Sequence, residues 1–193
     1  MAKKILDRSN SNKVRDAKDI AFRILALFGV VGVAFGAPRK DVISWLKDES
    51  LWIKLEPSEV LYLSMKRPTR KHSINASWKS EALIVLLWAL SKVEKLPEPN
   101  EQCDTSLFQR LLPPYSTETV EEFVSRAKRR SDTCLVEMAD NIKKMHWTIR
   151  NAKSHAERVS QKIDIEIIQE RHLAINWVIG YEGLPWDEVT TDT

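Results

Sequence analysis

The stretch from Asn75 to Val93 constrains the fold more than any other part of the sequence, because it is apolar on nearly every side of a helical wheel. Its apolar residues include Leu83, Val85, Leu86, Leu87, Trp88 and Leu90. A helix that is apolar all round lies in the interior of a fold, so further elements must surround it. Only 5 of the 193 residues are glycine and 8 are proline, which leaves little material for tight β-turns and favours helices as those elements.

Apolar periodicity and capping signals predict a series of helices and no strand. The predicted helices cover about residues 14–35, 38–47, 57–64, 75–93, 105–112, 117–130, 132–156 and 164–181. Pro38 and Pro57 fit the first turns of their helices, where a backbone N–H has no intrahelical partner. We therefore expect an all-α fold: a single-domain multi-helix bundle over residues 1–193, with a central apolar helix.

The acidic C-terminal tail, residues 183–193, is expected to be irregular but docked. Chain ends normally fray unless something anchors them, and Trp186 and Val189 are suitable apolar anchors. We expect these two side chains to enter a groove on the helical body, with Asp187 and Asp192 meeting arginines.

Charge and hydropathy exclude several classes of partner. The net charge of +3 is the difference between 30 basic and 27 acidic residues, a mixed surface that argues against a dedicated nucleic-acid binder. The apolar run from Ile24 to Ala37 is shorter than the ~20 residues needed to span a bilayer. We interpret this run as a core helix, and expect a cytoplasmic protein with no membrane partner. Cys103 and Cys134 are too few for a disulfide framework and are expected to be reduced.

Carboxylates on apolar helix faces are the main functional signal. Glu81, Asp140 and Glu170 are each followed by a tryptophan seven residues later, Trp88, Trp147 and Trp177. Seven residues are about two helical turns, so each indole lies on the face of its carboxylate. One interpretation is a polar pocket with aromatic walls, formed by Glu81, Glu137, Asp140, Trp147, Arg150, Glu170, Arg171 and Trp177. The alternative is a structural ion-pair network with arginines such as Arg130, Arg150 or Arg171.

One enzymatic pattern also remains open. Glu118-x-x-Glu121 and Glu137-x-x-Asp140 resemble the metal-binding motif of the all-helical nucleotide pyrophosphohydrolases. In those enzymes four acids on two facing helices hold Mg²⁺ against a nucleoside triphosphate, and Mg²⁺ prefers oxygen ligands. A ferritin-like di-iron site is excluded, because none of the four histidines has a glutamate three residues before it.

The sequence as a whole resembles the bacterial domain-of-unknown-function family 4272. The matching stretches are Trp78–Leu83, Leu87–Leu90, Cys103-Asp104, Arg130-Ser131, Glu137–Asp140, His146–Ala152, Glu170–Trp177, the tail from Trp186 to Thr193, and, near the start, Leu27–Leu55 with Trp45-Leu46-Lys47 and Leu51-Trp52. The resemblance implies a bacterial protein of this type. It implies no activity, cofactor or catalytic residue, because none is known for the family.

Two hypotheses of function follow. The first is a non-enzymatic cytosolic binding protein without a cofactor, which recognises a protein partner or a small molecule; toxin-neutralising and accessory factors are proteins of this kind. The second is a Mg²⁺-dependent nucleotide hydrolase. The hydrolase requires its four acids to converge on an open cleft, whereas the binding protein predicts that Glu137 and Asp140 are dispersed or tied to arginines.

Overall fold

The computed structural model describes residues 13–154 and 163–192, and these residues form helices, 3₁₀ turns and loops without a strand. The α-helices are α1 (Ala17–Ala34), α2 (Arg39–Asp48), α3 (Pro57–Ser64), α4 (Arg70–Ala89), α5 (Ser106–Leu111), α6 (Val120–Ser125), α7 (Asp132–Ser154) and α8 (Ile165–Val178). A short 3₁₀ turn at Trp52–Lys54 lies between α2 and α3, and two more, at Tyr181–Gly183 and Trp186–Glu188, lie after α8. The prediction of an all-α, single-domain bundle is confirmed. The predicted end of the long helix near residue 156 lies outside the described residues.

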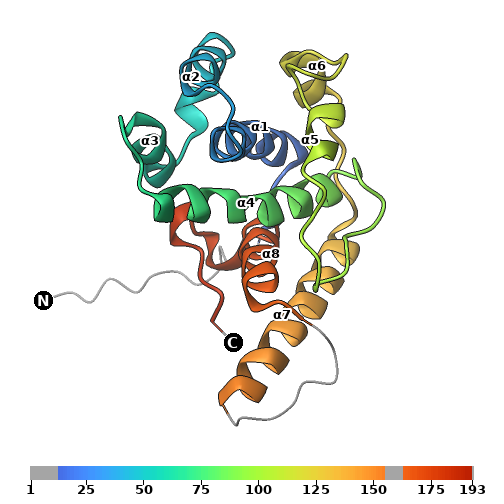
Figure 1. The fold of residues 1–193 in the computed structure, drawn as a ribbon. Helices are drawn as coiled ribbons and strands as arrows, with labels where there is room; N and C mark the ends of the chain where they lie inside the picture. The colour runs from blue at the N-terminus through green and yellow to red at the C-terminus, as the bar shows by residue number, and fades with distance from the viewer. Residues whose placement is uncertain (1–12, 155–162, 193) are drawn as a thin grey trace, which may run out of the picture.

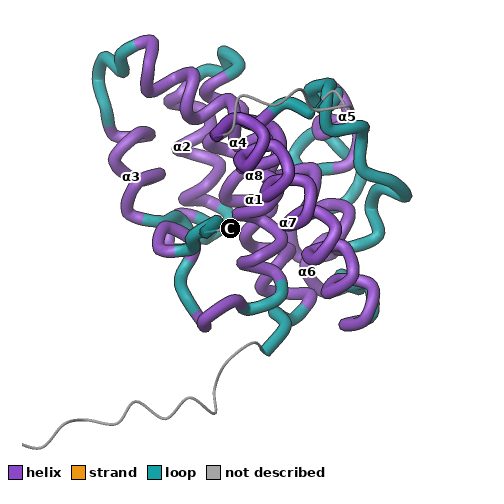
Figure 2. The backbone as a smooth tube through the Cα atoms, turned by 90° about the horizontal axis from the view of Figure 1, so that it is seen from below, coloured by secondary structure: helices purple, strands orange, loops and turns teal. Residues whose placement is uncertain are grey.

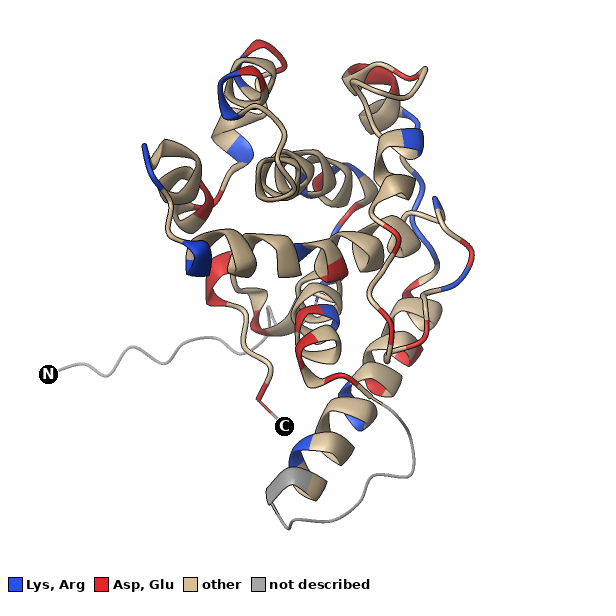
Figure 3. Ribbon diagram, viewed as in Figure 1, with Lys and Arg blue, Asp and Glu red and all other residues tan. Residues whose placement is uncertain are grey.

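Helix α4 runs through the centre of the bundle, as predicted. It packs most extensively against α8 on one side and α1 on the other, and α7 covers the far side of α8 (Figure 1). Figure 2, viewed from below, shows the same central stack of α1, α4 and α8 with α7 beside it. Every residue of α4 from Ser80 to its end is buried, Glu81 included. The charges gather instead on the outer elements (Figure 3).

Capping explains where α4 differs from its predicted bounds. It begins at Arg70 because Thr69 accepts a hydrogen bond from the His72 N–H, while the His72 ring accepts one from the Thr69 N–H. It ends at Ala89, before the predicted end at Val93, because Arg130 satisfies the carbonyls of this last turn. The Arg130 N–H donates to the Ala89 oxygen over 2.9 Å, and its Nε donates to the Trp88 oxygen over 2.8 Å.

The C-terminal tail is docked, as predicted. The Trp186 side chain is 1% exposed, and Val189 is also buried. The predicted arginine partner of Asp187 is wrong: its carboxylate accepts hydrogen bonds from the Ser58 N–H over 3.0 Å and from the Ser58 hydroxyl over 2.8 Å. An acid at the start of a helix is favourable because the first N–H groups there lack intrahelical partners, and Ser58 lies at the start of α3.

The apolar run from Ile24 onward is a core helix, as predicted. It forms most of α1, whose residues from Ile24 to Val31 are all buried. Among the described residues, none of the helices combines the length and the hydropathy needed to cross a membrane.

Candidate functional site

Glu81 and Arg171 form a buried ion pair between α4 and α8. Glu81 is 0% exposed, and one of its oxygens accepts a hydrogen bond from the Arg171 Nε over 3.0 Å and lies 2.8 Å from a terminal guanidinium nitrogen of Arg171. Its other oxygen accepts from the Cys103 N–H over 2.7 Å. Arg171 also donates to the Pro97 oxygen over 2.6 Å. Because every charge of this pair is satisfied by protein atoms, the pair fixes α4, α8 and the loop after α4 relative to one another.

Cys103, which lies next to this pair, is an inert thiol. Burial and the nearby Glu81 charge raise the pKa of Cys103 to about 12. A thiol is nucleophilic only as the thiolate, so Cys103 stays protonated and unreactive at neutral pH.

Glu170 precedes Arg171 in the chain but has a different environment. Burial raises the pKa of its carboxyl group, the positive charge of Lys79 on α4 lowers it, and the negative charge of Glu81 raises it further. Within the described part of the chain, neither the Glu170 nor the Lys79 side chain has a hydrogen bond or an ion pair within 4 Å. Two opposite charges are therefore held near each other, partly buried, without direct partners.

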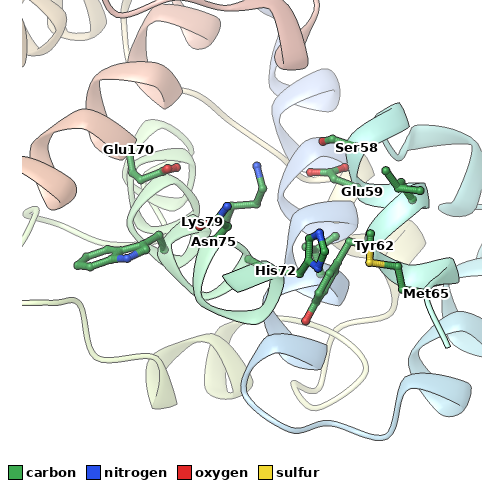
Figure 4. Close-up of a pocket in the computed structure, with 12 residues that line it drawn as sticks. Ser58, Glu59, Tyr62, Met65, His72, Asn75, Lys79 and Glu170 are labelled. Carbon is green, nitrogen blue, oxygen red and sulfur yellow. The ribbon is translucent and has the colours of Figure 1, made fainter. Parts of the chain in front are cut away.

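Both charges line one pocket of about 510 Å³ between α3, α4 and α8. Figure 4 shows Glu170 facing it from one side and Tyr62 and Met65 facing it from the other, with Lys79 and His72 of α4 between them. The lining residues are Val30, Ser58, Glu59, Leu61, Tyr62, Met65, His72, Asn75, Ala76, Trp78, Lys79 and Glu170. The pocket thus combines a charged part with an apolar, aromatic part.

Glu59 belongs to the wall of the pocket and is fully partnered. Both of its carboxylate oxygens accept from one Arg23 guanidinium nitrogen over 2.6 Å, and one of them also accepts from the Glu56 N–H over 3.0 Å. The Arg23 guanidinium in turn lies 5.0 Å from the centre of the Trp186 ring. This second buried pair holds α3, α1 and the C-terminal tail together behind the pocket.

The predicted shared pocket around three carboxylates is not formed. Asp140 and Trp147 lie on the outer face of α7, where Trp147 is 54% exposed, and they line a separate hollow of about 630 Å³ with Lys143, Lys144 and Asp192. Glu81 is buried, and Glu170 faces the pocket described above. Asp140 and Trp147 line the same hollow, whereas Glu170 and Trp177 line different ones, so the seven-residue spacing does not determine what an acid and its indole face.

The other residues of the predicted polar pocket lie outside the α3–α4–α8 pocket. Glu137 and Arg150 are exposed on α7. Trp177 is buried against Trp186, with ring centres 5.5 Å apart, and the Arg15 guanidinium lies 4.8 Å from its ring centre. Of the predicted set, only Glu170 lines the α3–α4–α8 pocket.

The four acids of the predicted Mg²⁺ site do not converge either. Helix α6 begins at Val120, so Glu118 lies before the helix, where it forms an ion pair with Lys92 over 3.0 Å. Glu121, Glu137 and Asp140 are exposed. Across residues 13–154 and 163–192, no three histidine, cysteine, aspartate or glutamate side chains are grouped closely enough to hold a metal ion.

A buried histidine pair between α7 and α8 was missed by the sequence analysis. The Nδ1 atoms of His146 and His172 are 2.9 Å apart, and both rings are buried. Burial and the neighbouring charges of His146 and Lys143 lower the pKa of His172 to about 4. The helical period could have predicted the burial of His146, because this residue falls between Ile142 and Ile149 on the buried face of α7.

Residues 3–189 match the sequence model of a family described as Domain of unknown function (DUF4272). The match covers nearly the whole chain, so the chain belongs to this family. No curated protein sequence shows significant similarity to the chain. No solved structure shows significant similarity to it either.

Proposed function

We propose that this DUF4272 protein is a non-enzymatic, cytosolic binding protein whose ligand is a small molecule held between α3, α4 and α8. The observation that carries the proposal is the pair of opposite charges, Glu170 and Lys79, which face one pocket and, among residues 13–154 and 163–192, form no hydrogen bond and no ion pair within 4 Å. Partly buried charges are costly when they are left unpaired. A ligand with complementary groups removes that cost, so the pocket is better satisfied when occupied.

The size and the lining of the pocket support a small organic ligand. Its volume of about 510 Å³ lies within the range of roughly 300–1,000 Å³ that is typical of such sites. Leu61, Tyr62, Met65 and Trp78 supply apolar and aromatic surface, and a few polar groups are placed among them. The buried Arg23–Glu59 and Glu81–Arg171 pairs behind the walls favour a preformed shape, which reduces the entropy lost on binding.

The chemistry of the lining favours binding over catalysis. The ring of His72 is engaged by the Thr69 N–H and hydroxyl in the cap of α4, so it is not placed to act as a base. Cys103, the buried thiol nearest Glu81, is held in its protonated form. Both cysteines are free thiols, which supports a reducing compartment such as the cytosol.

Differential scanning fluorimetry against a defined panel tests this function. The panel contains the twenty amino acids, common nucleosides and sugars, polyamines, and ATP and GTP with and without Mg²⁺. A ligand at a hundred times its Kd stabilises the folded state by about 2.7 kcal/mol. For a chain of this length that energy corresponds to a rise in Tm of roughly 5–10 °C.

Two variants show where a ligand binds. Asn75→Phe places a ring in the pocket from an exposed position, and we expect it to abolish the shift. Lys71→Met changes an exposed residue of α4 that does not line the pocket, and we expect the shift to remain. A shift that survives in Asn75→Phe, or no shift with any compound, contradicts the proposal. A shift that requires both a nucleotide and Mg²⁺ would favour the hydrolase instead.

A further inference from the structure

We propose that the ligand of the α3–α4–α8 pocket is a free α-amino acid with an apolar side chain, whose ammonium group binds Glu170 and whose carboxylate binds Lys79. This inference rests on the proposed small-molecule function and gives its ligand class. It follows from the arrangement of charges and apolar surface in the pocket.

The charges of the pocket require a ligand that carries both signs. A purely cationic ligand is attracted by Glu170 but repelled by Lys79, and a purely anionic ligand meets the reverse. Glu170 and Lys79 are close enough for the lysine charge to affect the carboxyl pKa, yet no ion pair within 4 Å joins them. A zwitterionic head group between them gives each charge an opposite partner and strengthens the hydrogen bonds that it makes.

An α-amino head group suits this gap because its ammonium and carboxylate groups are attached to the same carbon. Its two charges therefore lie a few ångströms apart, and the charged atoms of Glu170 and Lys79, which line the same pocket, lie more than 4 Å apart and leave room between them. The Asn75 side chain lines the pocket one turn before Lys79 and offers both a donor and an acceptor to the head group.

The remainder of the pocket selects an apolar side chain. Tyr62 of α3 and Met65, the residue after α3, lie on the side opposite Glu170 (Figure 4), and Leu61 of α3 also lines the pocket. Methionine side chains adapt to ligands of different shape, and the Tyr62 ring offers an aromatic surface. We therefore expect phenylalanine, methionine or leucine to bind more tightly than glycine, which supplies the head group alone.

Isothermal titration calorimetry with matched probes tests the ligand class. L-Phenylalanine is compared with phenethylamine, which lacks the carboxylate, with 3-phenylpropionate, which lacks the ammonium group, and with glycine. On the wild-type protein we expect L-phenylalanine to bind at least tenfold more tightly than each of the other three. Loss of one charged hydrogen bond accounts for a change of that size, roughly tenfold to a hundredfold.

Charge-removing variants assign the two ends of the ligand. Glu170→Gln should reduce the advantage of L-phenylalanine over 3-phenylpropionate, and Lys79→Met should reduce its advantage over phenethylamine. Glu166→Gln on α8 and Lys71→Met on α4 change exposed residues that do not line the pocket, and they should leave all affinities unchanged.

Two results overturn the ligand class. The first is equal or tighter binding of phenethylamine or 3-phenylpropionate to the wild-type protein. The second is no binding of any of the four probes at millimolar concentration. After either result, the fluorimetry panel decides whether the proposed small-molecule function fails as well. If another compound of that panel stabilises the wild-type protein but not Asn75→Phe, only the ligand class is wrong. The comparison of probes on the wild-type protein holds even if a variant fails to fold.

Discussion

Breaking the buried ion pair between Glu81 of α4 and Arg171 of α8 should destabilise the protein more than the substitution of any exposed charged residue. Removing one partner of a buried ion pair leaves the other charge unpaired and costs about 3–5 kcal/mol. Glu81→Gln keeps the volume of the side chain but removes the charge opposite Arg171, so we expect a loss near 3 kcal/mol. Glu81→Leu also removes the acceptor of the Cys103 N–H, so we expect a loss near 5 kcal/mol.

The double variant Glu81→Leu/Arg171→Met tests whether the loss of stability in each single variant comes from the charge that is left unpaired. It buries no charge, and it leaves unpaired mainly the Cys103 N–H and the Pro97 oxygen. Each unsatisfied backbone group costs about 1–3 kcal/mol, so the double variant should lose about 2–6 kcal/mol. The two single variants should together lose about 8–10 kcal/mol, near 5 for Glu81→Leu and about 3–5 for Arg171→Met, which predicts a coupling energy of at least about 2 kcal/mol.

Urea unfolding followed by circular dichroism measures these losses, provided that the m-value stays constant. Glu121→Gln, an exposed change on α6, is the control and should alter the free energy of unfolding by less than 0.5 kcal/mol, as is typical of surface sites. A loss below about 1 kcal/mol for Glu81→Gln, or single losses that add up in the double variant, would refute the reasoning.

Three further predictions use other features of the structure. The first concerns His172, whose pKa of about 4 in the folded protein lies below the ordinary histidine pKa of 6.5. As the pH falls, the unfolded chain therefore takes up a proton at this residue before the folded protein does. The free energy of unfolding should keep its full value above pH 6.5 and fall by roughly 3 kcal/mol as the pH drops to 4. Urea unfolding at several pH values should show a smaller loss in His172→Gln, where only the buried His146 of the pair remains, than in the wild-type protein, and equal pH profiles would contradict it. In native labelling with a thiol-specific disulfide reagent, half-buried Cys134 should react and Cys103 should not; labelling of Cys103 in the Cys134→Ser variant without unfolding would disprove its assignment as an inert thiol. Gly180→Ala should cost several kcal/mol in thermal unfolding, because Gly180 has a φ of +70° and a Cβ there would lie 2.2 Å from the Lys13 oxygen; a change below 1 kcal/mol would be inconsistent with that contact.

The fold was predictable because its strongest signal is local. An apolar surface on all sides of 75–93 requires a central helix, and the structure places α4 there. Helix ends were less predictable where two signals competed. Thr117 and Thr119 both suit the cap of α6, and the Glu122 side chain decides for Thr119 by completing the capping box.

The site was less predictable because burial depends on which helices meet. Glu81, Asp140 and Glu170 share the same local pattern, yet one is in a buried ion pair, one lies on the surface and one faces a pocket. The opposite charge that lines the pocket with Glu170 is Lys79, 91 residues earlier in the chain, and helical periodicity carries no information on such a juxtaposition.

Docking of the tail has a consequence for how the protein is made. Ser58, at the start of α3 and at the edge of the pocket, is held by Asp187, and Arg23 behind the pocket lies against Trp186. These partners are separated by more than 120 residues, so they are synthesised far apart in time. Helices α1, α3 and α4 are therefore synthesised well before α8, which closes the pocket, and before the tail, which holds Ser58 and Arg23 behind it.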